Sequence, residues 1–167
     1  MSIQPDQESA HLSTVPIAAR QYQGRRAGIV TRMVANGIDL VVIVLILGLI
    51  YGIYAGVLFL LHPRSFTLPS GLGWSMPVIG FVVVVPYLTI SWLTTGRTYG
   101  DALLGLRVVN SDGRRLNYVV AVLRAVAYVI FPIGVFWVAV SSANRSVQDI
   151  LLRTSVVYDW TPIADLR

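Results

Sequence analysis

Arg32 and Asp39 stand just before the first long apolar run of this chain, in the stretch "RMVANGIDLVVIVL". Charged groups beside hydrocarbon are costly, so they are usually paired, hydrated or functional. Seven residues is close to two helical turns, which places both side chains on one helix face about 10 Å apart along the axis. The guanidinium of Arg32 can reach toward Asp39 or toward another carboxylate such as Asp149. Asn36, one turn before Asp39, adds an amide to this polar notch.

Two kinds of chemistry fit this cluster. In the first, burial raises and Arg32 lowers the proton affinity of Asp39, which then exchanges a proton for a small cation, with Asp149 as a second carboxylate or gate. In the second, the three residues form a fixed ion-pair network that holds the first helix to helices at the membrane surface. Arg124, just inside the third apolar segment, either extends to lipid headgroups or joins this cluster. Asp101 is a further supporting candidate.

The sequence has no pattern of an enzyme. We find no nucleophile and base pair, no glycine-rich phosphate loop and no metal-ligand spacing such as H-E-x-x-H. The chain has no cysteine, which excludes disulfides and thiolate metal sites, and its two histidines stand apart in a tail and a loop. We therefore expect no catalytic residue, no metal and no cofactor.

The composition is that of an integral membrane protein. Of the 167 residues, 55% are hydrophobic and only 13% are charged, and the mean hydropathy is +0.69; soluble domains have about 25% charged residues. The net charge of +5 comes from arginine alone. No basic stripe interleaved with aromatic residues is present, so we expect a lipid bilayer and no nucleic acid as the partner.

Two uncharged runs, Leu40–Leu61 and Met76–Thr95, are each long enough to cross a bilayer as a helix. The second contains Pro86, and Trp92 near its end suits a membrane interface. We predict a disordered polar tail over residues 1–23, a transmembrane domain over 24–160 and a short tail over 161–167. Arginines flank the first run on its N-terminal side and the second on its C-terminal side, which predicts a cytoplasmic N-terminus, in a bacterial plasma membrane.

A third apolar segment is interrupted by "FPIG" at residues 131–134. Residues 125–143 either cross as a third span, or the proline and glycine turn a re-entrant helical hairpin back to the cytoplasm. The arginines that follow favour the hairpin. The predicted fold class is an all-α membrane protein with two clear transmembrane helices, this third segment and short amphipathic surface helices.

One pattern, R-[ST]-x-x-D-x-L-L-x-x-x-V-V, occurs twice, at residues 97–109 and 145–157. The spacing is that of a capping box, in which Thr98 or Ser146 caps a short helix and Asp101 or Asp149 occupies its third position. The valine pair at the end of the first copy favours a short strand. If the copies are structurally equivalent, both lie on one side of the bilayer.

Gly48, Gly52 and Gly56 recur at four-residue spacing within the first span. Small residues at this spacing allow close contact between membrane helices. We expect this face to form a homo-oligomer contact, and we also expect a membrane-protein partner.

These segments resemble the RDD family of small membrane proteins, named for one arginine and two aspartates. "AGIVTRMVANGIDLVVI" is similar to its first signature, "GRTYGDALLGLRVV" to its central segment and "RSVQDILLRTSVVY" to its last. By position, the name-giving residues would be Arg32, Asp39 and Asp149. The central segment departs from the family, which commonly has Gly-Lys where this chain has Gly100 and Asp101. The resemblance implies either transport, including sodium/proton exchange, or a non-catalytic adaptor role within a membrane complex.

Overall fold

The fold is taken from a computed structural model that describes residues 21–70, 73, 75–132, 134, 137, 141 and 145–160. The predicted C-terminal tail and all but the last three residues of the predicted N-terminal tail lie outside this described part. Gln23, the last residue of that predicted tail, donates a hydrogen bond to Asp159 at 2.9 Å.

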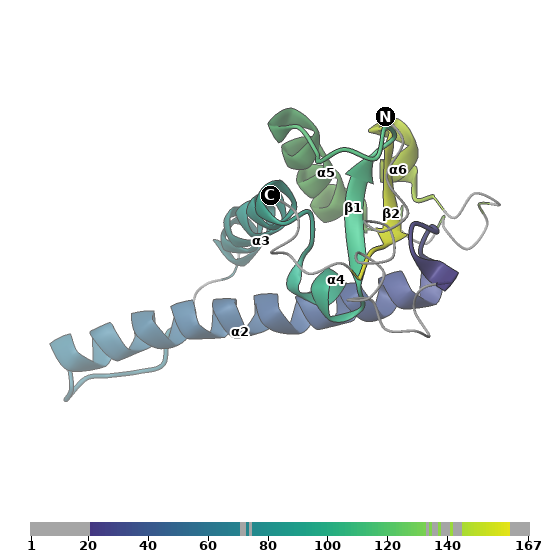
Figure 1. The fold of residues 1–167 in the computed structure, drawn as a ribbon. Coiled ribbons are helices and arrows are strands. Elements are labelled where there is room, and N and C mark those ends of the chain that lie inside the picture. Colours follow the sequence, from purple (N-terminus) through teal and green to yellow (C-terminus); the bar gives the residue numbers. More distant parts are fainter. Residues whose placement is uncertain are drawn as a thin grey trace.

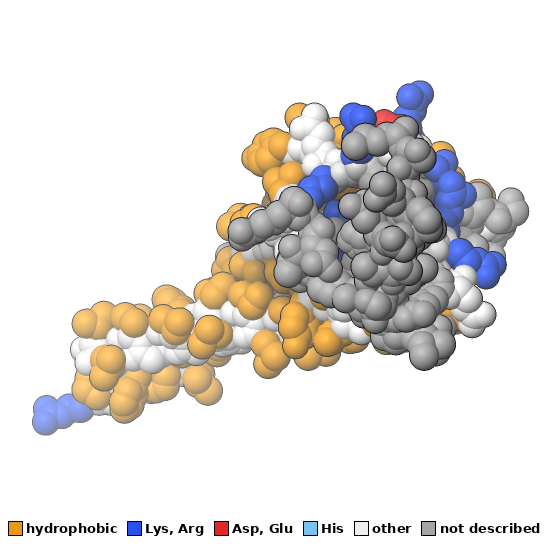
Figure 2. Space-filling view, viewed as in Figure 1, with side chains coloured by type: hydrophobic (Ala, Val, Ile, Leu, Met, Phe, Trp, Pro, Cys, Tyr) orange, Lys and Arg blue, Asp and Glu red, His pale blue; other side chains and the backbone are white. Residues whose placement is uncertain are grey.

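Helix α2, Ile29–Leu61, is 33 residues long, which corresponds to about 50 Å and exceeds the roughly 30 Å of a bilayer core. Its first turns bury Arg32, Ala35 and Asp39 against the rest of the molecule. The later part of the helix projects from this body, and its side chains are almost entirely hydrophobic (Figures 1 and 2). From Leu40 to Leu61 no residue of the helix is buried. The helix therefore joins a polar segment at the body to a free apolar segment.

Helix α3, Ser75–Thr94, matches the second predicted span to within one residue at each end and continues through Pro86. It is long and apolar enough to cross a membrane, as is α2. Its last turns bury Leu88, Thr89 and Trp92. Trp92 is only 2% exposed, so its assignment to a membrane interface was wrong: it packs inside the body.

The two sequence repeats fold alike. The first forms helix α4, Tyr99–Leu103, and strand β1, Leu106–Asn110; the second forms helix α6, Val147–Leu151, and strand β2, Thr154–Tyr158. The strands pair antiparallel, with Val108 opposite Val156. The protein is mostly helical, as predicted, but it is not all-α. A five-residue strand is stable only with a partner, and here that partner comes from the second repeat.

Helix α5, Tyr118–Ile130, is the start of the third apolar segment. It ends at Ile130 with Phe131 as its C-cap, because the ring of Pro132 disfavours helical backbone at the residue before it. Much of residues 133–144, where the hairpin and third-span predictions differ, lies outside the described residues.

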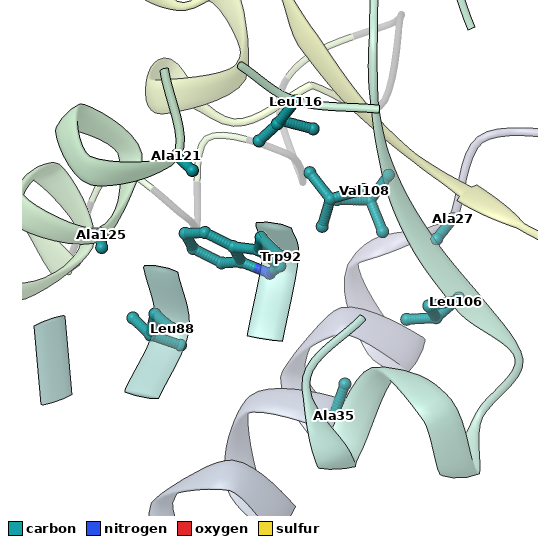
Figure 3. Packing of buried hydrophobic residues seen from close by; sticks show 10 residues of the cluster. Ala27, Ala35, Leu88, Trp92, Leu106, Val108, Leu116, Ala121 and Ala125 are labelled. Carbon is teal, nitrogen blue, oxygen red and sulfur yellow. The ribbon is translucent and has the colours of Figure 1, made fainter. Parts of the chain in front are cut away.

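The hydrophobic core lies where α2, α3, α5 and one face of the sheet meet (Figure 3). Trp92 is its largest member and lies between Val108 of β1 and the alanines of α5 (Figure 3). Alanines at positions 35, 121 and 125 let the helix backbones approach closely. This core holds the polar ends of α2 and α5 against the two repeats.

Candidate functional site

Asp149 is the centre of a buried ionic network. Residue Ser146 caps α6 in a capping box: its hydroxyl accepts a bond from the Asp149 amide, and its own amide donates to Asp149 Oδ2, both at 3.1 Å. The same carboxylate accepts a bond at 2.5 Å from Arg32 Nη1 on α2. Arg124 on α5 donates through Nη1 to Asp149 Oδ1 and to the hydroxyl of Thr154. One side chain therefore joins α2, α5, α6 and β2.

The network is almost free of solvent. Asp149 and Arg124 are 0% exposed and Arg32 is 3% exposed. Burial alone would raise the pKa of Asp149, but the charges of Arg124 and Arg32 outweigh it and hold this pKa well below its usual range. Asp149 is therefore an anion at every physiological pH, and its role is that of a fixed counterion.

Arg124 also contacts two aromatic rings. Its guanidinium carbon lies 5.0 Å from the ring centroid of Trp92 and 5.3 Å from that of Tyr128, within the range of a cation–π contact. The two rings pack edge to face at 5.6 Å. The prediction that Arg124 either snorkels or joins the cluster is thus resolved: it is fully buried in the cluster.

Asp39 has a separate set of partners. It accepts hydrogen bonds from the hydroxyls of Thr98 at 2.5 Å and Tyr87 at 2.7 Å, and from the amide of Gly100 at 2.8 Å. Arg32, in contrast, bonds to Asp149. The two name-giving residues of α2 therefore fasten the helix at two points, Arg32 to α6 and Asp39 to α4.

Gly100 allows α4 to lie directly on α2. A Cβ added to this residue would be 2.1 Å from the carbonyl oxygen of Ala35 and 3.1 Å from Cγ of Asp39. Only a glycine fits this approach. The corresponding position of the second repeat is Gln148, so this contact distinguishes the two copies.

Asp101 completes the predicted capping box of α4. The Thr98 hydroxyl accepts from the Asp101 amide at 3.1 Å, and Asp101 Oδ2 accepts from the Thr98 amide at 3.2 Å. Burial raises the pKa of Asp101; bonds from Thr98 oppose this, and the nearby Asp39 adds to it. The pKa shifts of Asp101 and Asp149 therefore have opposite signs.

Two cavities adjoin these carboxylates. A small one of about 20 Å³ is lined in part by Asp39, Asp101 and Arg124. A larger one of about 530 Å³ lies between α2, α3 and α5, is lined mainly by apolar side chains, and has Asn36 and Asp39 at its polar part. Asn36 lines both cavities. Among the described residues, no group of three or more histidines or acidic residues is placed to hold a metal ion.

The sequence matches the RDD family over residues 26–153. The match includes Arg32 and Asp39 of α2, the whole first repeat, and the second repeat as far as Arg153. The chain belongs to the RDD family.

The chain is also similar to the uncharacterized protein YxaI of Bacillus subtilis (strain 168), to which it is 32% identical over 90 residues. The aligned part is 50% of this chain and 59% of YxaI. No solved structure matches the chain. With its two long apolar helices, this chain is an RDD family membrane protein.

The fold brings together all the residues proposed from sequence, but in two groups. Arg32, Arg124 and Asp149 form the ionic network, and Asp39, Asp101 and Asn36 line the small cavity beside it. Sequence reasoning missed Tyr87 as a hydrogen-bond partner of Asp39, because a lone hydroxyl in an apolar run is common in membrane helices. It also missed Thr154 of β2 as a partner of Asp149.

Sequence reasoning also missed a second ion cluster. Asp159 contacts Arg97 at 3.2 Å and Arg107 at 3.1 Å. The only sequence signal was the position of Arg97 at the head of the first repeat. This cluster ties the start of that repeat to the end of β2.

Proposed function

We propose that this RDD family protein is a non-catalytic membrane adaptor, in which the ionic network holds α2 at a fixed angle so that its free half can bind another membrane helix. The observation that carries this proposal is the contrast between the two halves of α2. The first half is fastened by Arg32 and Asp39. In the second half, from Leu40 to Leu61, no residue is buried.

The glycine face of the free half supports this role. Gly48, Gly52 and Gly56 are open, since a Cβ at any of them would meet no atom within 4 Å. Close backbone approach at such a face is a main source of helix association in lipid, where the hydrophobic effect between helices is weak. A helix whose direction is set in advance loses less freedom on binding. The proposed partner is a membrane helix, either of a second copy or of another protein.

The arrangement of the repeats supports a topology for this adaptor. Because β1 and β2 pair, the chain leaves and re-enters the same body, which favours a re-entrant third segment. Basic side chains gather on this body (Figure 2), whereas the loop after α2 carries Arg64. By the positive-inside rule, the body and the N-terminus belong in the cytoplasm.

Cysteine scanning tests the adaptor proposal, since the chain has no cysteine of its own. Single cysteines placed along residues 45–60 in native membranes should cross-link with a helical period centred on the glycine face. Gly52→Ile should abolish cross-linking, and the matched control Ile53→Leu should not. Arg32→Ala should weaken cross-linking without touching the glycine face. Uniform or absent cross-linking would refute the proposal.

A second candidate function is cation-coupled proton transport through Asp39. The observation that favours it is the place of Asp39 between the small cavity and the larger apolar one. Purified protein in proteoliposomes decides between the two roles. Sodium-dependent proton movement that disappears in Asp39→Asn would support transport, and no movement by the wild-type protein would exclude it and leave the adaptor role.

A further inference from the structure

The equivalent aspartates of the two repeats, Asp101 and Asp149, have different hydrogen-bond partners. In the second repeat, Asp149 bonds to two guanidiniums and to the hydroxyl of Thr154 as well as to its cap. In the first repeat, within the described ranges, the Asp101 carboxylate accepts a hydrogen bond from the Thr98 amide, and the Asp101 amide donates one to the Thr98 hydroxyl. The residue that corresponds to Thr154 is Leu106, which has no hydroxyl. Asp101 therefore has spare acceptor capacity.

The small cavity lies beside this carboxylate. Its volume of about 20 Å³ has room for one water molecule, which needs roughly 10–15 Å³. Asp39 and Asp101 supply acceptors on its wall, and Val108 and Val156 of the sheet close another part of the wall. The cavity thus has both polar and apolar walls.

Buried donor atoms of residues that line this cavity have no hydrogen-bond partner in the described part of the chain. Among them are Nε1 of Trp92 and Nη2 of Arg124. Trp92 is 2% exposed and Arg124 is fully buried. Buried N–H groups without acceptors are rare, and a bound water commonly satisfies them. These unpartnered donors are a second observation, separate from the two carboxylates, that indicates a bound ligand.

We propose that this cavity binds a single ordered water molecule that accepts hydrogen bonds from Trp92 and Arg124 and donates to Asp101 and Asp39. Only a ligand that both donates and accepts fits these walls. The two N–H donors disfavour a metal cation, and the two carboxylates disfavour an anion. Two donors and two acceptors match the two to four polar partners of a typical buried water.

This water would connect the two repeats. Arg124 bonds to Asp149 of the second repeat, and Asp101 belongs to the capping box of the first. The water takes the place in the first repeat that guanidinium and hydroxyl groups take in the second.

Nuclear magnetic resonance of the full chain in lipid nanodiscs tests the site. The chain has four tryptophans, so indole labelling gives few signals, and Trp92→Phe identifies the one that matters. The expected result is a through-space cross-peak between the Trp92 indole proton and water. In Val156→Leu, whose larger side chain fills the cavity, the cross-peak should be lost, whereas the neighbouring Val157→Leu should retain it.

A second filling variant, Val108→Ile, serves if Val156→Leu fails to fold. No water cross-peak from Trp92 in the wild-type protein would mean a dry cavity and would overturn the proposal. A cross-peak that survives in a folded cavity-filling variant would also overturn it. A saturable shift of the Trp92 signal with sodium chloride, but not with choline chloride, would show that sodium occupies the cavity instead.

Discussion

Replacing Gly100 with alanine should detach α4 from α2. The new Cβ would lie 2.1 Å from the Ala35 carbonyl oxygen, far inside the ordinary contact range of 3.4–4 Å. The obstacle is helix backbone, which cannot rotate away, so α4 must move by more than an ångström. That movement lengthens the bonds to Asp39 from the Gly100 amide at 2.8 Å and from the Thr98 hydroxyl at 2.5 Å.

The expected loss of stability is about 3 kcal/mol. Each hydrogen bond to a charged group contributes roughly 1.5–3 kcal/mol, and two such bonds are strained. The better helix propensity of alanine returns up to about 1 kcal/mol. Gly37→Ala is the matched control: this glycine lies inside α2 with no atom within 4 Å of an added Cβ, so the change should stabilise by roughly 0.5–1 kcal/mol.

Denaturant unfolding in detergent micelles measures both variants, and a double-mutant cycle links the effect to Asp39. Because Asp39→Asn weakens the same bonds, its combination with Gly100→Ala should destabilise less than the sum of the two single changes, by about 1–3 kcal/mol. A change of about 0.5 kcal/mol is typical of a surface substitution. If the free energy of unfolding of Gly100→Ala lies within about 0.5 kcal/mol of the wild-type value, then α4 does not pack on α2 as described.

Three further predictions concern the repeats. Burial raises the pKa of Asp101 above its ordinary 3.8. The contribution of protonated Asp101 to folding stability is therefore full below that value and is lost as pH rises through the folded-state pKa. Melting temperatures measured from pH 4 to 8 should show that Asp101→Asn flattens this pH dependence and stabilises the protein at pH 7. Arg124→Met breaks a buried ion pair and should lower the free energy of unfolding, measured with denaturant, by about 3–5 kcal/mol. Arg114 is exposed, so Arg114→Met should lower it by less than about 0.5 kcal/mol. Arg153 has a left-handed φ of 52° where the first repeat has Gly105 at 63°, so Arg153→Gly should raise the free energy of unfolding by up to about 1 kcal/mol; equal or lower stability would contradict this.

The parts of the fold predicted correctly are those encoded by local spacing. The second span follows from an uncharged run of sufficient length, and both capping boxes follow from residues three positions apart. Only one strand of the pair was predicted. The valine pair of the first repeat favoured a strand, but the strand it pairs with lies in the second repeat. Describing the protein as all-α was therefore wrong because a sheet depends on a contact between distant segments.

The pairing of the charges was not readable from sequence. Arg32 had two acceptors in reach, and the sequence left Asp39 and Asp149 equally open. In a helix, side chains lean toward the N-terminus, so Arg32 leans away from Asp39, which follows it. Its partner Asp149 is 117 positions away. No helical periodicity contains that information, because it depends on how α6 is placed by the second repeat.

Asp149 has a different environment from Asp39 and Asp101, and this difference decides where function should be tested. Asp149 is bonded on both oxygens to guanidiniums, so Asp149→Asn should unfold the body whether the protein transports or only anchors. A loss of activity in that variant would carry no information about mechanism. Asp39 and Asp101 border a water-sized cavity and lack such partners among the described residues. Substitutions at these two positions can change proton binding while the ionic network of the second repeat still holds the fold.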